Sequence, residues 1–402
     1  MVDGVYPPMT TPIFAFSGVS LTYFACMGLF NPYAPLWFKE LGFSTLAIGS
    51  IASLQSWTRV LAPYAWSWFG DHSGQRVRLL RLAALGSLLA AVALWGTRSY
   101  WAVATATTLI FVFNAGVVPL SEAALARHLA TAQGMDAGRY GRVRVWGSIG
   151  FIIVVLVGGP ALELLGIDSF PYAIALLYGL LVVATLRLPV GPDAAQHDEP
   201  AQPIWPLLRQ PEVAWFFASV FFTVLAHTSA YVFLSLYLDA LGYGKTAVGL
   251  LWAMSVVFEI AFFWYQGRWF HRLSPRGWLK LASAVTALRF VATAAAAQWV
   301  WILVLAQASN ALTFAAHHAA CTSILHRHFP GRLRGRGQAL YSTLGYGISG
   351  VVGGVGGGWL ISRHGFEAVY WAAVAAALVG LGCAFRAAGG SIKETPGRPK
   401  FP

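Results

Sequence analysis

The sequence predicts an all-α membrane protein with twelve transmembrane helices in two six-helix pseudo-repeats. Three observations support this fold class. Hydrophobic residues make up 57% of the chain and charged residues only 10%, whereas soluble domains carry roughly a quarter charged residues. Apolar runs near the length of about 20 residues that a membrane-spanning helix needs recur along the whole chain. The basic residues collect in alternate connections between these runs.

These apolar runs define the expected membrane helices, and polar or Gly- and Pro-containing stretches separate them. The three cysteines, Cys26, Cys321 and Cys383, fall inside the runs, so we expect no disulfide framework. We place the helices at about 13–37, 45–69, 79–97, 100–121, 145–166, 171–188, 213–239, 246–266, 278–296, 299–325, 338–361 and 367–386.

The net charge of +12 reflects membrane topology rather than a nucleic-acid partner. Most of the 27 Lys and Arg residues lie in connections on one side of the expected membrane, and Arg59 and Arg289 lie within helices. The other side carries only Lys39, Arg98, Lys245 and Arg363. Under the positive-inside rule, both termini and every connection from an even to an odd helix face the cytoplasm. The amino terminus lacks Lys and Arg, and we do not expect a signal peptide.

A polar connection at 189–211 divides the chain near its middle. Its Pro, Asp and Glu content predicts a cytoplasmic linker between an N-terminal six-helix bundle, 1–188, and a C-terminal bundle, 212–402. A weak internal repeat supports this division, because GRVRVWGSIG starts at Gly141 and GRGQALYSTLG starts at Gly335. The eleventh expected helix is rich in glycine, which indicates either tight packing or a surface on which the halves rock.

The connection between the second and third expected helices, residues 67–80, reads SWFGDHSGQRVRLL. It resembles the signature loop of the major facilitator superfamily, of the type Gly-x-x-x-Asp-Arg-x-Gly-Arg-Arg. The departures from this pattern are Ser67, His72 and Gln75. In the family the loop acid contacts the other half, and the basic residues lock one access state. The resemblance therefore implies a gating role for the matching residues, Asp71, Gly74 and Arg76.

Further stretches resemble one branch of this superfamily, the phenylpropionate-permease type, which is related to the lactose and nucleoside proton symporters. They extend over nearly the whole chain: NPYAPLWFKELGFSTLAIG (31–49), RVLAPYAW (59–66), VPLSEA (118–123), YGRVRVWGSIGF (140–151) and GRGQALYSTLGYG (335–347). The resemblance implies the major facilitator fold. We expect a multi-pass protein of the bacterial inner membrane that works as a monomer.

Glu259 is the first candidate for proton coupling. It lies in an apolar run that extends back to Thr246, where an ionised side chain costs at least a few kcal/mol unless it finds a partner or faces a cavity. Arg289 and the pair His317 and His318 lie on the next two expected helices. Each is nine or ten residues from a basic residue at the cytoplasmic edge, which places it about 13–15 Å into the bilayer.

An acid, a base and an imidazole at one depth predict a proton relay in which the arginine stabilises the ionised carboxylate. A static buried ion pair that holds the bundle together is the alternative. The lactose branch has a similar set on its helices eight, nine and ten, but its main proton site is an acid on helix ten. The tenth expected helix here has no Asp or Glu. Proton binding is therefore expected at Glu259, with a contribution from His317 or His318.

Arg59 is the main candidate for substrate binding, because a guanidinium can bind a carboxylate through two hydrogen bonds. The alternative is pairing with Glu122 or a carbonyl. Glu122 with Arg142 or Arg144 resembles the sugar-binding acid and arginine of the lactose branch, although its position nearer the cytoplasm favours a structural gate. Further cavity candidates, which equally fit packing, are Asn31, Gln55, Asn114, Trp146, Tyr231, Asn310 and Tyr341.

We expect a proton-coupled symporter that imports a small aromatic carboxylate such as a phenylpropionate. Protons, the substrate and the lipid bilayer are its expected partners. The alternatives are a sugar or nucleoside proton symporter and a proton-antiport effluxer. The sequence has no GxSxG, HExxH or phosphate-loop motif, so we expect neither an enzyme nor a cofactor nor a metal site.

Overall fold

A computed structural model describes residues 11–131, 134–190, 204–330 and 333–388 of the chain. The first part of the chain is helical apart from one short two-stranded ladder, in which β1 pairs antiparallel with β2. Its elements are α1 (Thr11–Glu40), α2 (Thr45–Ser73), α3 (Arg76–Val92), α4 (Tyr100–Asn114), α5 (Val117–Leu129), β1 (Ala130–Thr131), β2 (Gly134–Met135), α6 (Ala137–Leu164), the 3₁₀ turn η1 (Ile167–Ser169) and α7 (Phe170–Leu186).

The second part of the chain is also helical, and two of its segments are π-helical. Its elements are α8 (Trp205–Leu208), α9 (Pro211–Ala240), α10 (Lys245–Tyr265), the 3₁₀ turns η2 (Gln266–Arg268) and η3 (Phe270–Arg272), α11 (Pro275–Ala296), α12 (Val300–Ala308), the π-helix η4 (Ala311–Ala316), α13 (His317–His328), α14 (Arg334–Leu340), the π-helix η6 (Tyr341–Ile348), α15 (Ser349–His364) and α16 (Phe366–Ala388).

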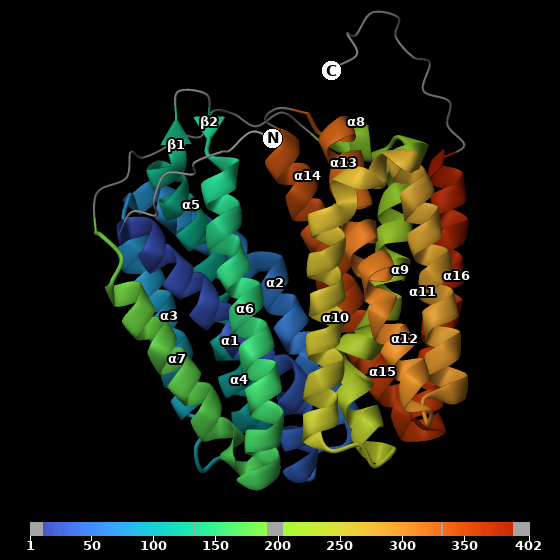
Figure 1. Cartoon of the computed structure of the whole chain (residues 1–402), viewed down its shortest axis with the longest axis horizontal. Helices are drawn as coiled ribbons and strands as arrows, with labels where there is room; N and C mark the ends of the chain where they lie inside the picture. The colour runs from blue at the N-terminus through green and yellow to red at the C-terminus, as the bar shows by residue number, and fades with distance from the viewer. Residues whose placement is uncertain (1–10, 132–133, 191–203, 331–332, 389–402) are drawn as a thin grey trace, which may run out of the picture.

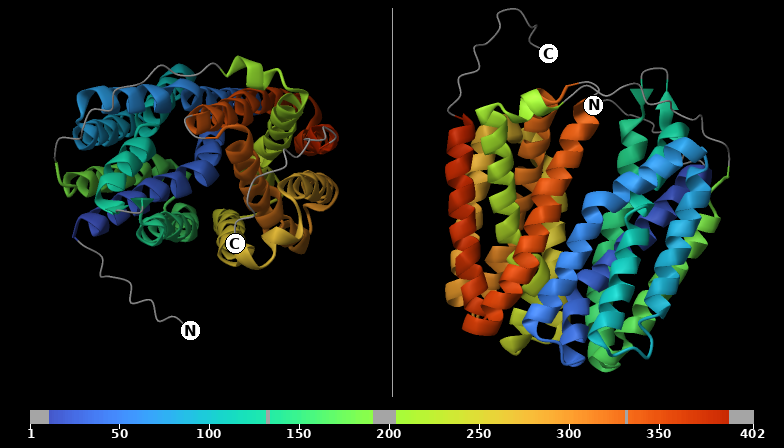
Figure 2. Two further views of the ribbon diagram at one scale, coloured as in Figure 1. Left: turned by 90° about the horizontal axis from the view of Figure 1, so that it is seen from above. Right: turned by 180° about the vertical axis from the view of Figure 1, so that it is seen from behind.

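The helices form two groups, α1–α7 and α9–α16, that lie side by side with their axes roughly parallel (Figure 1). At the end that carries β1, β2 and α8 the two groups diverge, and at the opposite end they come together (Figures 1 and 2). Contacts of α2 with α15 and of α6 with α10 join the groups. We call these two ends the basic end, where the basic connections lie, and the contact end.

Within the described residues, ten helical stretches are long and apolar enough to cross a membrane. The two expected helices outside this set are α2 and α3. α3 has 17 residues, and α2 is interrupted by polar side chains that include Arg59. A multi-pass, all-helical protein is therefore established, whereas twelve crossings and the two-bundle division remain predictions. Most of the expected linker, residues 191–203, lies outside the described residues.

A break divides the fourth expected helix, 100–121, into α4 and α5. Pro119 has no N–H for the carbonyl four residues earlier, and its ring crowds that carbonyl. At the break the amide of Gly116 donates to the carbonyl of Phe113 at 3.1 Å. The indole Nε1 of Trp66 donates to the carbonyl of Val112 at 2.8 Å. A side chain on α2 thus supplies a hydrogen bond where a bilayer offers no water.

The glycine-rich α15 packs closely against α2. A Cβ on Gly354 would lie 2.6 Å from the carbonyl oxygen of Gly49 and 3.1 Å from the backbone nitrogen of Ser53. These are backbone atoms of α2 and cannot rotate away. The close approach lets the Ser53 hydroxyl donate to the carbonyl of Val351 on α15, at 2.8 Å. Glycine at position 354 therefore keeps the two helix groups in contact, while a rocking motion on this surface stays a prediction.

Gly354→Ala should destabilise the protein, because its new methyl group meets the backbone of α2. Overpacking of this kind costs about 1–3 kcal/mol. Gly356→Ala is the matched control on the same helix, since a Cβ at Gly356 has no atom within 4 Å. Thermal unfolding of both variants in detergent should show a lower midpoint for Gly354→Ala alone. Equal midpoints would contradict the packing argument.

Candidate functional site

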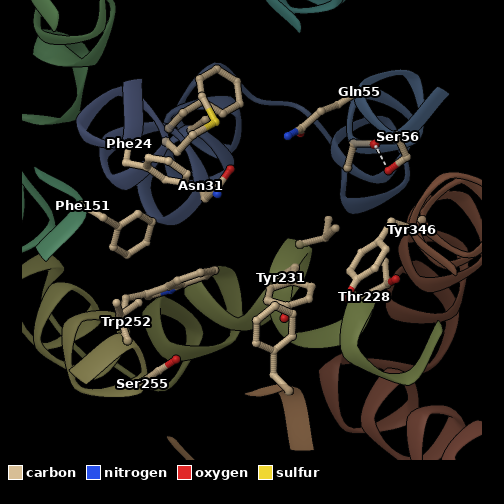
Figure 3. Close-up of a pocket in the computed structure, with 18 of the residues that line it drawn as sticks. Phe24, Asn31, Gln55, Ser56, Phe151, Thr228, Tyr231, Trp252, Ser255 and Tyr346 are labelled. Carbon is tan, nitrogen blue, oxygen red and sulfur yellow. Dashed lines mark hydrogen bonds between the residues drawn. The ribbon is translucent and has the colours of Figure 1, made fainter. Parts of the chain in front are cut away.

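A cavity of about 810 Å³ lies between the two helix groups, within the range of about 300–1,000 Å³ that is typical of small-molecule sites. The central parts of α1, α2 and α6 form one wall, and α9, α10, η4, α13, η6 and α15 form the other. Figure 3 shows side chains from both groups pointing into this space. The walls are mainly aromatic and aliphatic, with polar groups at a few positions.

Two cations face the cavity from the first helix group. Arg59 on α2 and Arg144 on α6 both line it, and both side chains are exposed. The guanidinium of Arg144 lies 4.5 Å above the ring of Phe24, a cation–π arrangement that orients the group. Asn31 and Gln55 line the same wall, and their amides point toward the space between the groups (Figure 3).

One carboxylate, Glu259, faces the cavity from α10, which belongs to the second group. Tyr231 on α9 and Trp252 on α10 line the same wall of the cavity (Figure 3). The indole Nε1 of Trp252 donates to the Oγ of Ser235 at 3.2 Å, which fixes the ring. The cavity therefore has cations on one wall, an acid on the opposite wall and aromatic rings on both.

A buried polar cluster lies behind Glu259. The guanidinium of Arg289, 6% exposed, donates to Oδ1 of Asn310 at 2.5 Å, Oγ1 of Thr313 at 2.9 Å and Oε1 of Gln307 at 3.3 Å. Nδ2 of Asn310 donates in turn to the carboxylate of Glu259. In the described structure Arg289 and Glu259 form no direct ion pair. Glu259 and Arg289 are therefore connected indirectly, through the side-chain amide of Asn310.

The two adjacent histidines lie in different environments. His318 lines the cavity, and its Nδ1 lies 3.0 Å from the hydroxyl of Tyr341. That hydroxyl lies 3.2 Å from the hydroxyl of Tyr346, which reaches back to the cavity wall. His317 is buried, with both ring nitrogens 3.7 Å from Sγ of Cys321. Only His318 of the pair is therefore in direct reach of a cavity substrate.

Six of the expected binding residues lie outside the cavity lining of the described structure, and two of these, Asn310 and Tyr341, are buried behind the wall. Asn114 is buried, with its Nδ2 3.7 Å from Sδ of Met27. Trp146 packs against Phe14, and Arg142 is half-buried on α6. Glu122 lines a small neighbouring pocket and accepts a hydrogen bond from the hydroxyl of Tyr140 at 2.9 Å. Arg144 borders this small pocket as well as the central cavity.

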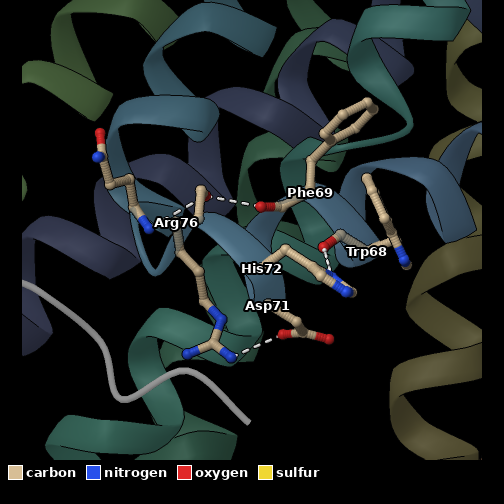
Figure 4. Close-up of polar contacts among 7 residues, drawn as sticks. Trp68, Phe69, Asp71, His72 and Arg76 are labelled. Carbon is tan, nitrogen blue, oxygen red and sulfur yellow. Dashed lines mark hydrogen bonds and ion pairs between the residues drawn. The ribbon is translucent and has the colours of Figure 1, made fainter. Parts of the chain in front are cut away.

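The signature loop lies at the basic end, between α2 and α3. Arg76 forms an ion pair of 2.7 Å with Asp71 within the loop (Figure 4). Gly74 ends α2 with a φ of 59°, a left-handed conformation that glycine adopts without strain. Nδ1 of His72 lies 2.9 Å from the carbonyl oxygen of Trp68. The loop acid and arginine therefore contact each other at the end where the groups diverge.

Polar contacts join the two groups at the contact end. Lys39 on α1 pairs with Asp239 on α9 at 2.6 Å. The carboxylate of Glu163 on α6 accepts hydrogen bonds from the backbone N–H of Thr246 at 3.1 Å and from its Oγ1 at 2.5 Å. Thr246 is in the first turn of α10, so a side chain of one group caps a helix of the other. A carboxylate is favoured there by the helix dipole.

Sequence reasoning missed these contact-end partners and one histidine. His227 on α9 is buried, and its Nδ1 lies 2.8 Å from the carbonyl oxygen of Thr223. Its ring stacks on that of Tyr231 at 6.2 Å. The signal was available, since His227 is a titratable residue in the middle of an apolar run, as Glu259 is. The pairing of Glu163 with Thr246 has no comparable signal, because it joins segments far apart in the chain.

Two helix groups in contact at one end, with a substrate-sized cavity near their middle, are an arrangement found in membrane transporters. The family comparison agrees with this assignment. The model of the MFS_1 like family matches residues 13–372, and the chain belongs to that family. It is therefore a multi-pass membrane transporter of the major facilitator type, and the resemblance inferred from its sequence motifs is confirmed.

Relatives in sequence and solved structures of similar fold are transporters as well. The chain is 30% identical over 368 residues to the "Probable 3-phenylpropionic acid transporter" of Escherichia coli (strain K12), covering 89% of this chain and 93% of the relative. It is 28% identical to the maltose permease of Geobacillus stearothermophilus, with 89% of each chain covered. The fold matches the crystal structure of a mutant of the nucleoside transporter NupG, with a TM-score of 0.79 and 17% identity, over 93% of this chain and 99% of that one.

Glu163→Ala should make the contact end open more often, because it removes both hydrogen bonds between α6 and the first turn of α10. The readout is a cysteine introduced at Ala34, a residue of the cavity wall, in a variant without the three native cysteines. A membrane-impermeant maleimide applied from the contact end should label it several-fold faster when Glu163 is replaced. Glu40→Ala, an exposed acid at the same end, is the control, and equal labelling in both variants would refute the capping role.

Proposed function

We propose that this chain is a proton-coupled symporter that imports a small aromatic carboxylate, such as a phenylpropionate, by alternating access. The observation that carries the proposal is the charge distribution of the central cavity. Arg59 and Arg144 face it from the first helix group, and Glu259 faces it from the second. A site of this kind attracts an anion on one wall and can take up a proton on the other.

The binding of the carboxylate is assigned to the two guanidinium groups. Arginine binds carboxylates through paired N–H donors in one plane, which gives direction as well as affinity. The aromatic part of the substrate would lie among Tyr231, Phe151 and Phe314, which line the same cavity. The name of the Escherichia coli relative supports this substrate class.

Glu259 is the proposed proton site, with His318 as a second group in the same cavity. When ionised, the carboxylate is held by the polar cluster around Arg289. A proton taken up from the outside neutralises it and removes the cost of moving a charge through an apolar region. The loaded transporter can then change its access state, and release of the proton inside resets it.

The sidedness of the protein follows from its basic connections. The basic end carries most of the Lys and Arg residues, so the positive-inside rule places this end in the cytoplasm. The divergence of the groups at this end then corresponds to an inward-facing state. We further propose twelve crossings in two six-helix halves, both termini in the cytoplasm, a bacterial inner membrane and a functional monomer.

A sugar or nucleoside proton symporter is the second candidate. Glu122 and Tyr140 lie in the small pocket that Arg144 shares with the central cavity, and an acid beside an arginine can bind sugar hydroxyls. The maltose permease relative and the nucleoside transporter of similar fold suggest these substrates. Proton-antiport efflux would use the same proton site in the opposite direction. Competition by maltose or uridine distinguishes the substrate classes, and the direction of an imposed proton gradient distinguishes symport from antiport.

Purified protein in proteoliposomes should take up labelled 3-phenylpropionate when the pH is lower outside than inside. Glu259→Gln should abolish this gradient-driven uptake, because the amide cannot exchange a proton. The same variant should retain exchange of internal for external substrate, which needs no net proton movement. Maltose and uridine serve as competitors.

Uptake that is indifferent to Glu259→Gln would contradict the assigned proton site. Displacement of the label by maltose or uridine would favour the second candidate, and uptake only under an outward-directed proton gradient would indicate antiport. The neutral analogue 3-phenylpropionamide is the ligand control. It should not compete, because it lacks the charge that the guanidinium groups are proposed to bind.

Arg59→Gln should raise the KM for 3-phenylpropionate about 10- to 100-fold, since a hydrogen bond to a charged group is worth about 1.5–3 kcal/mol. Arg59→Lys should give a smaller increase, because it keeps the charge and loses the paired geometry. Arg98→Gln is the matched control, because Arg98 is exposed in the connection before α4, away from the cavity. An unchanged KM in Arg59→Gln would remove this residue from the substrate site.

A further inference from the structure

Asn310 occupies an unusual position between two opposite charges. Its Oδ1 accepts a hydrogen bond from Arg289 on α11, and its Nδ2 donates to both Glu259 and Ser255 on α10. The side chain is 3% exposed and lies behind the cavity wall rather than in it. One amide therefore contacts three side chains on two neighbouring helices.

The orientation of this amide is determined by its partners. A guanidinium has only donors, so the group that faces Arg289 must be the carbonyl oxygen of Asn310. The NH₂ group then points to α10, where it donates to the carboxylate of Glu259. Arg289 has two other acceptors, in Gln307 and Thr313. The guanidinium is thus held by neutral oxygens and does not need Glu259 as a direct partner.

We propose that Asn310 is a positioning residue that makes the attachment of α10 to α11 and η4 depend on the charge of Glu259. The inference rests on the proposed role of Glu259 as the proton site. An ionised carboxylate accepts a stronger hydrogen bond than a neutral acid, and the Arg289 contact polarises the amide further. Protonation of Glu259 weakens this bond and loosens α10 from the rest of its group.

α10 connects this cluster to the contact end. Its first turn is capped by Glu163 through Thr246, while Glu259 and Ser255 on the same helix contact Asn310. A change in how α10 is held at its middle is transmitted along the helix to this cap. Protonation of Glu259 can thereby influence the access state through Asn310 and α10, without any movement of Arg289.

The proton affinity of Glu259 depends on several further groups in the described structure. Arg289 on α11, Tyr231 on α9 and Tyr346 on η6 interact with it electrostatically. The same cavity is lined by Tyr23, Arg59, Arg144 and His318. A test must therefore separate the contact of Asn310 with Glu259 from effects that reach Glu259 through Arg289. Gln307 provides that separation, because it contacts Arg289 and not Glu259.

The test is infrared spectroscopy of the purified protein in nanodiscs across pH 5–9, which records the protonated carboxyl band. Subtraction of the Glu259→Gln spectra isolates Glu259. Asn310→Leu should move the midpoint of this band upward by about one pH unit or more, because the ionised form loses a donor. Asn310→Ala removes the same donor with a smaller side chain and adds no charge, so it should also move the midpoint upward. Gln307→Leu should leave the midpoint within about 0.3 of a unit.

Each outcome distinguishes the inference from the proposed function. A downward shift in Asn310→Leu, or equal shifts in Asn310→Leu and Gln307→Leu, would mean that Asn310 acts only through Arg289 and would overturn the inference alone. A Glu259 band that does not titrate would remove the proton site, and both proposals would fail. If Asn310→Leu does not give a monodisperse protein, Asn310→Ala takes its place, and an unchanged midpoint in that variant would overturn the inference.

Discussion

The solvation of one buried cation, Arg289, organises the second helix group. A guanidinium in an apolar interior is stable only if protein atoms replace the water it has lost. Gln307, Asn310 and Thr313 do so from α12 and η4, which ties these segments to α11. Asn310 then brings in α10 through Ser255 and Glu259. The amide of Asn310 thus connects the cavity-facing carboxylate to the buried cation behind it.

The need of buried polar groups for hydrogen-bond partners also explains why the two helix groups touch at the contact end and diverge at the basic end. Close to the contact end, backbone and side-chain polar groups of the two halves satisfy one another, as in Thr246 with Glu163 and Ser53 with Val351. Glycines permit this by letting α2 and α15 approach until their backbones touch. At the basic end the polar groups of the signature loop pair within the loop. An interface built from a few such contacts can separate without exposing a large apolar core.

The cavity combines features that packing alone does not call for. Arg59 and Arg144 are exposed cations at the wall of a mainly apolar space, where a charge without a counter-charge is costly. Both lie on the first helix group, and Glu259 lies on the second. Substrate and proton are thus proposed to bind to opposite helix groups. The interaction between the two binding sites then depends on the distance between these groups. This is the physical basis for coupling the two in an alternating-access cycle.

The sequence by itself determined the helical class, the positions of most helices and the places of Glu259 and Arg289 along their helices. These are properties of a single chain segment, since apolar run length and helical rise fix where a residue lies along a helix axis. The tertiary structure decided which way each residue faces and what it meets. Trp146 packs against Phe14 and Asn114 contacts Met27, and neither lines the cavity, while Asn310 joins Arg289 to Glu259. Rotation about a helix axis depends on the neighbouring helices, and the periodicity of one segment carries no record of those neighbours.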